Sequence, residues 1–139
     1  MSDTRTCANA AKAFVVHDGK ALVLRRRDND VHGPGQWDIP GGRLNDGEDP
    51  YDGVRREARE EASIAIDIEQ VIDVQWFTRD DEQHITMMIF ACSLQGSGTV
   101  RLSEEHVEYR WVPVEEVTAL QSWLAPVVGR YQRWMCGAA

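Results

Sequence analysis

The sequence predicts an α/β (α+β) fold, an α/β/α sandwich in which helices cover both faces of a mixed β-sheet. Two observations support this prediction. Apolar runs of strand length, mostly separated by short turns, lie on either side of one internal helix, and a second amphipathic helix closes the chain. Strands and helices in this order bury their apolar sides when the helices pack on the sheet. With 139 residues, the chain is expected to form a single domain over residues 1–139.

The first predicted elements form a β-hairpin. Residues 11–16 and 21–24 are apolar, and the Asp18-Gly19 dipeptide between them is typical of the primed turns that join paired strands. Residues 28–36 are rich in Asp, Asn, Gly and Pro and are expected to form a loop. A short strand over residues 37–42 is predicted to end in a break at its two glycines, before a second loop over residues 45–49.

An internal helix is predicted from Pro50 to about Ser63. Asp49 suits the N-cap, and proline suits the first helical position because an N–H there would have no partner within the helix. Asp52 adds negative charge at the positive end of the helix dipole. Four residues recur at helical spacing and are expected to form the buried face: Tyr51, Val54, Ala58 and Ala62.

The second half of the chain is predicted to contain strands followed by helices. Residues 64–78 and 84–93 resemble strands on either side of a turn at 80–82, and residues 99–102 and 108–112 are short strand candidates. A short helix is expected over residues 113–120 and a longer one within 122–135. The apolar face of the last helix comprises Leu124, Val127, Val128, Tyr131, Trp134 and Met135.

Five tryptophans lie within these elements. Trp37, Trp76 and Trp111 fall on strand patterns and are expected in the core rather than as platforms for base stacking. Trp123 and Trp134 lie on the C-terminal helical segment, where they either complete the core or form a contact between two copies of the chain. A homodimer is therefore one of two interpretations of this segment.

Composition disfavours several classes of protein. The formal net charge of −8, from 23 acidic and 15 basic residues, disfavours binding to a nucleic-acid polymer. No apolar run approaches the ~18 residues of a membrane span, and the N-terminal residues show no signal-peptide pattern. Cys7, Cys92 and Cys136 show neither zinc spacing nor a disulfide framework. A cytoplasmic protein without membrane contact is therefore expected.

The densest acidic segment runs from residue 46 to 61, where seven of sixteen residues are carboxylates. On a helix, Glu57, Glu60 and Glu61 occupy positions i, i+3 and i+4 and share one face, within an arc of about 100°. Two interpretations are open. The carboxylates form a solvated acidic face that neighbouring arginines relieve, or they form an oxygen-rich site for Mg²⁺ or Mn²⁺, which suit such ligands and bind substrate phosphates.

The spacing around these glutamates resembles the signature of the Nudix hydrolases, G-x5-E-x7-R-E-U-x-E-E-x-G-U, in which U is a bulky aliphatic residue. The matching residues are Gly42, Glu48, Arg56, Glu57, Glu60, Glu61 and Ile64. Residues 37–42 also look like the family segment that leads into the signature. Two positions depart from it: Ala58 replaces an aliphatic residue, which thins the packing, and Ser63 replaces a glycine, which carries a steric cost if the helix ends in the left-handed conformation.

The resemblance implies a Nudix fold and a role for each matching residue. The implied metal ligands are the carbonyl of Gly41 or Gly42 and the carboxylates of Glu57, Glu60 and Glu61. Glu60 and Glu61 are also the catalytic candidates within the motif. Glu48 and Arg56 correspond to an ion pair that ties the loop to the helix and orients it. The implied cofactor is Mg²⁺, with Mn²⁺ as an alternative, and its ions would activate water and neutralise phosphate oxygens.

Further candidates lie outside the motif. Family members often take a base or metal ligand from another loop, and Glu105 is the candidate here, with Glu104 as the reserve; the alternative is an exposed acidic turn. Arg26 is the substrate-binding candidate, since family members often place an arginine near this position against a phosphate or nucleotide; the alternative is a charged edge strand. The four histidines show no metal spacing and are expected in surface or loop positions.

The implied activity is metal-dependent hydrolysis of a diphosphate bond in a nucleoside diphosphate linked to another group. The short chain favours a small-molecule nucleoside triphosphate, including an oxidised or noncanonical one. The alternatives are ADP-ribose or another nucleotide sugar, a non-catalytic module that binds a nucleotide, and an isomerase of diphosphate substrates. An isomerase would need a cysteine near the motif, and Cys92 is the candidate left open for that role.

Overall fold

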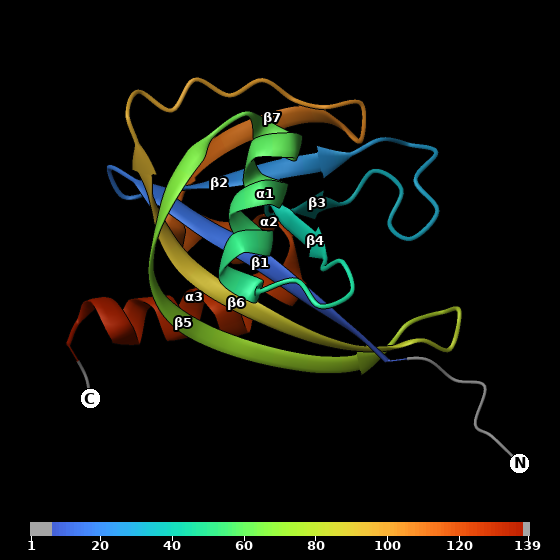
Figure 1. The fold of residues 1–139 in the computed structure, drawn as a ribbon. Helices are drawn as coiled ribbons and strands as arrows, with labels where there is room; N and C mark the ends of the chain where they lie inside the picture. Colours follow the sequence, from blue (N-terminus) through green and yellow to red (C-terminus); the bar gives the residue numbers. More distant parts are fainter. Residues whose placement is uncertain (1–6, 138–139) are drawn as a thin grey trace, which may run out of the picture.

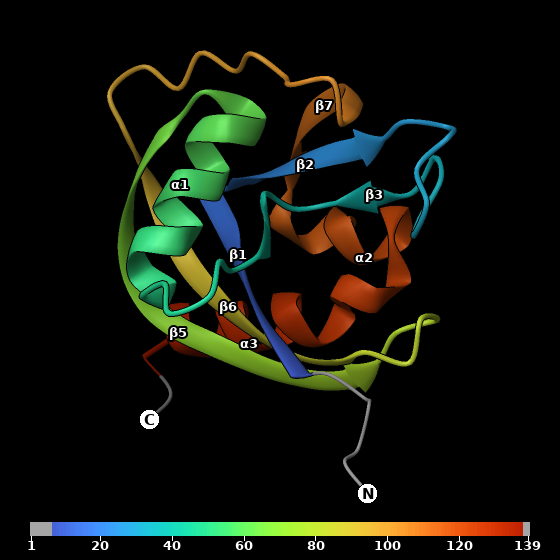
Figure 2. The same ribbon diagram turned by 45° about the vertical axis from the view of Figure 1, so that its right-hand side comes forward.

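The computed structural model describes residues 7–137 and has the α/β/α sandwich that the sequence predicts (Figures 1 and 2). The strands are β1 (Cys7–His17), β2 (Lys20–Arg26), β3 (Trp37–Asp38), β4 (Gly41–Arg43), β5 (Ala65–Thr78), β6 (His84–Gln95) and β7 (His106–Pro113). The helices are α1 (Pro50–Ala62), η1 (Val114–Glu116), α2 (Val117–Leu120), η2 (Ser122–Leu124) and α3 (Ala125–Met135). Within residues 7–137, every helix is too short or too polar to span a bilayer.

The seven strands form one mixed sheet with the neighbour order β3-β2-β1-β6-β5, in which β4 also pairs with β1 and β7 with β2. β1 runs parallel to β6 and antiparallel to β2 and β4. β1 and β2 pair only beside their shared turn, while β4 lies against β1 at residues 10–12. The sheet therefore opens between β1 and β2, and the chain from β3 to β4 bridges this opening.

The predicted hairpin is confirmed, and two of the other strand predictions are wrong. Asp18 and Gly19 have φ values of 50° and 76°, the positive φ that a primed turn requires. The two glycines of residues 37–42 belong to a second short strand, β4, rather than to a break. Residues 99–102 form no strand, because Arg101 and Ser103 donate their N–H groups to the free carbonyls of Ala62 and Glu61 at the end of α1.

Two apolar cores lie on opposite faces of the sheet. On one face α1 buries Val54, Ala58 and Ala62 against the strands, and on the other face the C-terminal helices bury an apolar set of Leu124, Val127 and Val128. Alternation along β1 serves both cores, since Ala13 belongs to the α1 side and Phe14 to the α3 side. Figures 1 and 2 show α1 and α3 on either side of the sheet.

Three residues expected in the core are exposed instead. Tyr51 in the first turn of α1 is 47% exposed, Trp76 near the end of β5 is 74% exposed, and Met135 at the end of α3 is 58% exposed. Each lies near the end of its element, where helical or strand periodicity continues but the neighbouring layer covers the side chain at most in part. The ring of Tyr51, for example, still packs on that of Phe90, with 5.2 Å between the ring centroids. Trp123 and Trp134 are partly buried against the core beside α3, so they contribute to that core.

Candidate active site

Helix α1 carries the acidic motif, and both of its ends form as the sequence predicts. The side chain of Asp49 accepts a hydrogen bond from the N–H of Tyr51 at 2.7 Å. Ser63 adopts the left-handed conformation, with φ 58° and ψ 34°, in which glycine is the usual residue. Its hydroxyl donates to the carbonyl of Arg101 at 3.1 Å, and this hydrogen bond offsets part of the steric cost.

The two glycines of β4 bring backbone against the carboxylates of α1. Gly41 has a φ of 135°, and a Cβ atom there would overlap the carbonyl oxygen of Ala11, so only glycine fits. The N–H of Gly41 donates to Oε1 of Glu61 at 3.1 Å. At Gly42, a Cβ atom would lie 3.2 Å from Oε2 of Glu57. Glycine at position 41 therefore lets β4 lie close to the backbone of β1, and glycine at position 42 lets β4 approach Glu57 on the helix.

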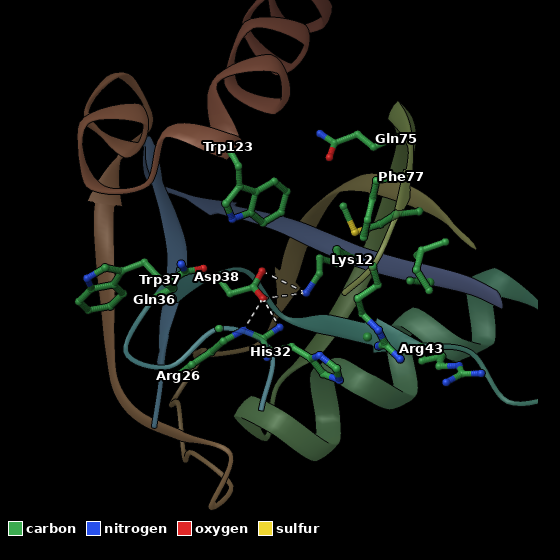
Figure 3. A pocket seen from close by; sticks show the side chains of 16 residues that line it. Lys12, Arg26, His32, Gln36, Trp37, Asp38, Arg43, Gln75, Phe77 and Trp123 are labelled. Carbon is green, nitrogen blue, oxygen red and sulfur yellow. Dashed lines mark hydrogen bonds and ion pairs between the residues drawn. The ribbon is translucent and has the colours of Figure 1, made fainter. Parts of the chain in front are cut away.

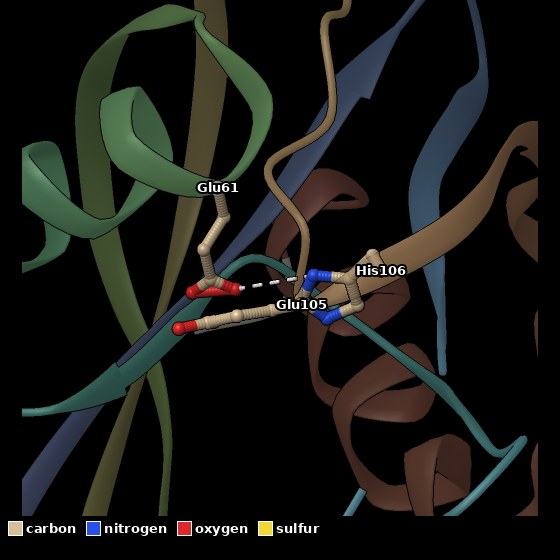
Figure 4. Close-up of side chains that lie close together, drawn as sticks. All are labelled: Glu61, Glu105 and His106. Carbon is tan, nitrogen blue, oxygen red and sulfur yellow. Dashed lines mark ion pairs between the residues drawn. The ribbon is translucent and has the colours of Figure 1, made fainter. Parts of the chain in front are cut away.

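A pocket of about 210 Å³, here called the carboxylate pocket, lies where β4, α1 and the start of β7 meet. Its lining comprises Arg26, Asp30, Gly41, Gly42, Arg43, Glu57, Glu61, Glu105 and His106. Ligand atoms of Glu61, Glu105 and His106 all lie within 4.8 Å of one another (Figure 4). The fold thus gathers acidic groups from two segments about 44 residues apart in the chain, a donor set that suits a divalent cation.

The structure brings most of the predicted site residues to this pocket, but not all of them. Glu57, Glu61 and Glu105 line it, together with Gly42 and Arg26. The side chain of Glu60 is 59% exposed and accepts a hydrogen bond from Nη1 of Arg56 at 3.0 Å, outside the pocket lining. A metal-binding role for Glu60 therefore requires its side chain to turn from this position toward the pocket.

Glu61 is the most buried of these carboxylates, with 4% of the residue exposed. Burial raises the pKa of Glu61 to about 9; the positive charge of Lys12 opposes this rise, and the carboxylate of Glu57 adds to it. A buried carboxylate beside another carboxylate favours its protonated form. A divalent cation would reverse this preference, because the bound ion favours the ionised carboxylate.

Arg56 holds the loop before α1 against the helix. Its Nε and Nη2 donate to the two carboxylate oxygens of Glu48, each at 2.8 Å. This fork holds the pKa of Glu48 down at about 2. Nη1 of the same guanidinium reaches Glu57 at 3.2 Å and Glu60 at 3.0 Å. The guanidinium of Arg56 thus donates hydrogen bonds to three carboxylates of the motif.

A buried charge network beside the pocket was missed by the sequence analysis. Asp38 accepts hydrogen bonds from Nζ of Lys12 at 3.0 Å and from Nη2 of Arg26 at 2.7 Å. Burial acts to raise the pKa of Asp38, but these two cations hold it below its ordinary value. Arg26 also pairs with Asp30 at 3.2 Å. The sequence feature that could have indicated this network is Lys12, the one charged residue within the apolar run of β1, since a buried charge needs a partner.

The expectation of a surface or loop position is wrong for His106, which is 7% exposed. The pairing of β7 with β2 shifts register between Arg25 and Arg26, which leaves Val107 as an extra residue and pairs His106 with Arg26. Burial lowers the pKa of His106 to about 4. The negative charge of Asp38 opposes this decrease, and the positive charge of Arg26 adds to it. Strand alternation alone does not reveal this inward position.

A second, larger pocket of about 570 Å³ adjoins the first and is here called the large pocket (Figure 3). It shares Arg26, Gly42 and Arg43 with the carboxylate pocket. Its other lining residues are Ala10, Lys12, His32, Gly33, Gln36, Trp37, Asp38, Gln75, Phe77, Arg79, Ile85, Met87 and Trp123. Aromatic rings, aliphatic side chains and polar amides therefore lie directly beside the acidic site.

Comparison with known proteins gives consistent matches. The model of the NUDIX domain family matches residues 8–134. A MutT-like protein of Streptomyces ambofaciens is 33% identical over 110 residues, and the match covers 79% of this chain but only 66% of that protein. Nucleoside triphosphatase NudI of Escherichia coli K12 is 29% identical over 114 residues, 75% of this chain and 80% of the relative. The crystal structure of a MutT protein from Methanosarcina mazei Go1 superposes with a TM-score of 0.80 at 28% identity over 98% of each chain.

Proposed function

Since this chain belongs to the NUDIX domain family, we propose that it is a divalent-metal-dependent pyrophosphohydrolase that cleaves a diphosphate bond in a nucleotide. The observation that carries the proposal is the junction of two unlike pockets. Acidic groups line the smaller pocket, aromatic groups line the larger one, and Arg26, Gly42 and Arg43 lie between them. A phosphate chain over this junction would place its nucleoside in the large pocket and its reacting phosphorus beside the carboxylates.

The proposed metal ligands are the carbonyl of Gly42 and the carboxylates of Glu57, Glu60 and Glu61, with Mg²⁺ as the ion and Mn²⁺ as the alternative. Glu57 and Glu61 support this assignment, because they lie close together against β4 and one of them is deeply buried. When bound, the ion would polarise the phosphate oxygens and make water a stronger nucleophile. Without such an ion, a chain of net charge −8 would repel a polyanionic substrate.

Other residues of the chain are proposed to bind, orient and transfer protons. Glu105 would accept the proton of the attacking water, because its carboxylate reaches the same pocket from a separate segment. Glu48 and Arg56 would orient the motif loop. Arg26 would bind the substrate phosphates while it keeps its ion pair with Asp38. Arg43 would also bind phosphate, since it lines the pocket and makes no ion pair within the described part of the chain.

A nucleoside triphosphate is the proposed substrate, and a relative of 29% identity named a nucleoside triphosphatase supports this choice. ADP-ribose or another nucleotide sugar is the alternative, because the large pocket also has room for a sugar. The isomerase alternative loses its support. Cys92 lies in the apolar core under α1, lines neither of the two pockets, and burial raises its thiol pKa to about 12.

The test is product analysis over a panel of nucleoside triphosphates, ADP-ribose and nucleotide sugars, with and without Mg²⁺ or Mn²⁺. We expect release of pyrophosphate and a nucleoside monophosphate from a triphosphate, and no turnover in the presence of a chelator. Tight nucleotide binding without turnover of any compound would favour a non-catalytic binding module. Turnover only of the sugar derivatives would move the assignment to a nucleotide-sugar pyrophosphatase.

A further inference from the structure

We propose that His106 is a nitrogen ligand in a second metal position of the carboxylate pocket, formed with Glu61 and Glu105, and that this position prefers first-row transition-metal ions to Mg²⁺. The inference depends on the proposed function only in placing a metal ion in this pocket. It adds a ligand that the acidic motif does not contain, and with it a different metal selectivity.

The first observation is a buried nitrogen without a hydrogen-bond partner. The side chain of His106 is 5% exposed, and its Nδ1 makes no hydrogen bond within residues 7–137. Buried polar atoms in folded proteins almost always have a partner, so an exception calls for an explanation. In Figure 4 the imidazole turns this nitrogen toward the carboxylate of Glu61. A bound ion would supply the partner that the chain itself does not.

The second observation is the spacing of the donor atoms. Nδ1 of His106 lies 3.8 Å from Oε2 of Glu61, which is too long for a hydrogen bond. Two ligands that each lie about 2.0–2.2 Å from one ion are roughly 3–4 Å apart. The carboxylate of Glu105 completes a group whose ligand atoms all lie within 4.8 Å of one another. These three side chains are therefore close enough to share one ion after small side-chain adjustments.

The third observation is that the two carboxylate oxygens of Glu61 face different parts of the pocket. Oε1 accepts the hydrogen bond from the N–H of Gly41, on the β4 side, where Glu57 also lies. Oε2 instead faces His106, on the β7 side. The carboxylate can therefore contribute to one position near β4 and to another near β7. Among the described residues that line the pocket, His106 alone offers an imidazole nitrogen, and it lies at the position near β7.

The donor types then determine which ions each position prefers. Carboxylate and carbonyl oxygens suit Mg²⁺ and Mn²⁺, whereas imidazole suits iron, nickel, copper and zinc ions. Mg²⁺ also requires near-ideal octahedral geometry and releases its water ligands reluctantly. The mixed set of one imidazole and two carboxylates therefore favours ions such as Co²⁺, Fe²⁺ or Zn²⁺ over Mg²⁺.

The test uses the full, untagged chain and metal binding rather than turnover. Pulsed electron paramagnetic resonance of the protein loaded with one equivalent of Cu²⁺, a paramagnetic ion that imidazole ligands suit, detects coupling to a directly bound imidazole nitrogen, and labelling with ¹⁵N-histidine identifies its source. We expect histidine-nitrogen coupling in the wild-type protein and its loss in His106→Gln. The matched control is His84→Gln, because His84 lies on β6, lines neither of the two pockets and should leave the coupling unchanged.

A Co²⁺ titration in excess Mg²⁺ supplies the second readout. We expect His106→Gln to weaken Co²⁺ binding by at least about 10–100-fold, because loss of a residue that only supports a metal ligand already costs that much, while Mg²⁺ binding changes far less. Absence of histidine coupling in the wild-type protein would overturn the proposal even if the variant does not fold. Coupling or Co²⁺ affinity that persists in folded His106→Gln would overturn it as well. Neither outcome depends on finding a hydrolysed substrate, so a failure here is distinct from a failure of the proposed hydrolase function.

Discussion

The two adjoining pockets share three residues, yet they are built in different ways. The carboxylate pocket takes Glu57 and Glu61 from one turn of α1, and the short distance between them follows from helical geometry. The large pocket takes its walls from every strand from β1 to β6 and from η2, so its lining residues run from Ala10 to Trp123 along the chain. Charged groups dominate the first, whereas aromatic and aliphatic side chains such as Phe77 and Trp123 contribute to the second.

Under the proposed function, each pocket would take a different part of the reaction. Clustered carboxylates act where charge changes during bond cleavage, so changes to them should lower kcat. Aromatic walls hold a planar base equally in the ground state and the transition state, so changes to them should raise KM. The following substitutions test this separation, in order of expected effect.

The largest effect is expected in the carboxylate pocket. Glu61→Gln and Glu60→Gln each remove one charge with little change of shape, and we expect each variant to lose activity by orders of magnitude in Mg²⁺, because each removes a proposed metal ligand. Steady-state kinetics at saturating Mg²⁺ measures the loss. Near-full turnover in both variants would show that the metal assignment on α1 is wrong. A loss in Glu61→Gln alone would show that Glu60 is not a metal ligand.

The same residue predicts how stability changes with pH. The folded-state pKa of Glu61 is raised from 4.5 to about 9, so the folded protein binds a proton that the unfolded chain releases. Its contribution to stability is fully present below about pH 4.5 and is lost as pH rises toward 9. Metal-free Glu61→Gln should therefore lose less stability than wild type over this interval. Melting temperatures in a chelator across pH provide the measurement, and parallel curves would contradict the prediction.

The next effect concerns the proposed base. Glu105→Gln should lower kcat by about 10²–10⁴-fold and change KM little, since a general base acts in the transition state. Glu104→Gln is the matched control, because its neighbour lines the carboxylate pocket and Glu104 does not. Kinetics of both variants across pH tests the assignment, and Co²⁺ binding to Glu105→Gln separates the role of base from that of metal ligand, because loss of a ligand alone would weaken binding. A tenfold or smaller loss in Glu105→Gln, or a larger loss in Glu104→Gln, would transfer the role of the base to another residue.

A smaller effect is expected in the large pocket. Trp123→Ala removes an aromatic wall, and we expect KM to rise roughly 5–150-fold with kcat nearly unchanged, which corresponds to about 1–3 kcal/mol of base stacking. The matched control is Trp76→Ala, since Trp76 is exposed on β5 and lines neither of the two pockets. A fall in kcat without a rise in KM would contradict the separation between the two pockets.

The ion pair between Glu48 and Arg56 should affect the stability of the fold more than the rate of hydrolysis. Glu48→Gln and Arg56→Gln should each destabilise the fold, and the double variant should cost less than the sum of the two, because the Glu48–Arg56 fork can be lost only once. Urea unfolding of all four proteins gives the coupling. Strict additivity would show that the contact contributes no coupling energy.

The smallest effect is expected at the end of α1. Ser63→Gly relieves the left-handed strain but loses the hydrogen bond to Arg101 and raises the entropy of the unfolded chain, so we expect a change within about 0.5 kcal/mol. Ser63→Ala keeps the strain, loses the hydrogen bond and should be the less stable of the two. Thermal unfolding compares them, and a clearly destabilised Ser63→Gly would show that the hydroxyl contact outweighs the strain.

The local features of the chain could be predicted from the sequence because neighbouring residues decide them. Asp49 and Pro50 begin α1, Ser63 ends it, and Asp18-Gly19 turns the hairpin, each through contacts within a few residues. The sequence periodicity also predicted most of both cores. It failed at Trp76, because alternation gives the period of a strand but does not show which part of each face a helix covers.

The sequence by itself determined the family resemblance, the mixed sandwich and the helix that carries the acidic motif. Only the tertiary structure decided that Lys12 and Asp38, 26 residues apart, form a buried pair, and that a bulge turns His106 toward Glu61. The large pocket likewise forms only where segments from Ala10 to Trp123 meet in the fold. Helix spacing and capping depend on short-range geometry, whereas the burial of a charge depends on chain segments that folding alone brings together.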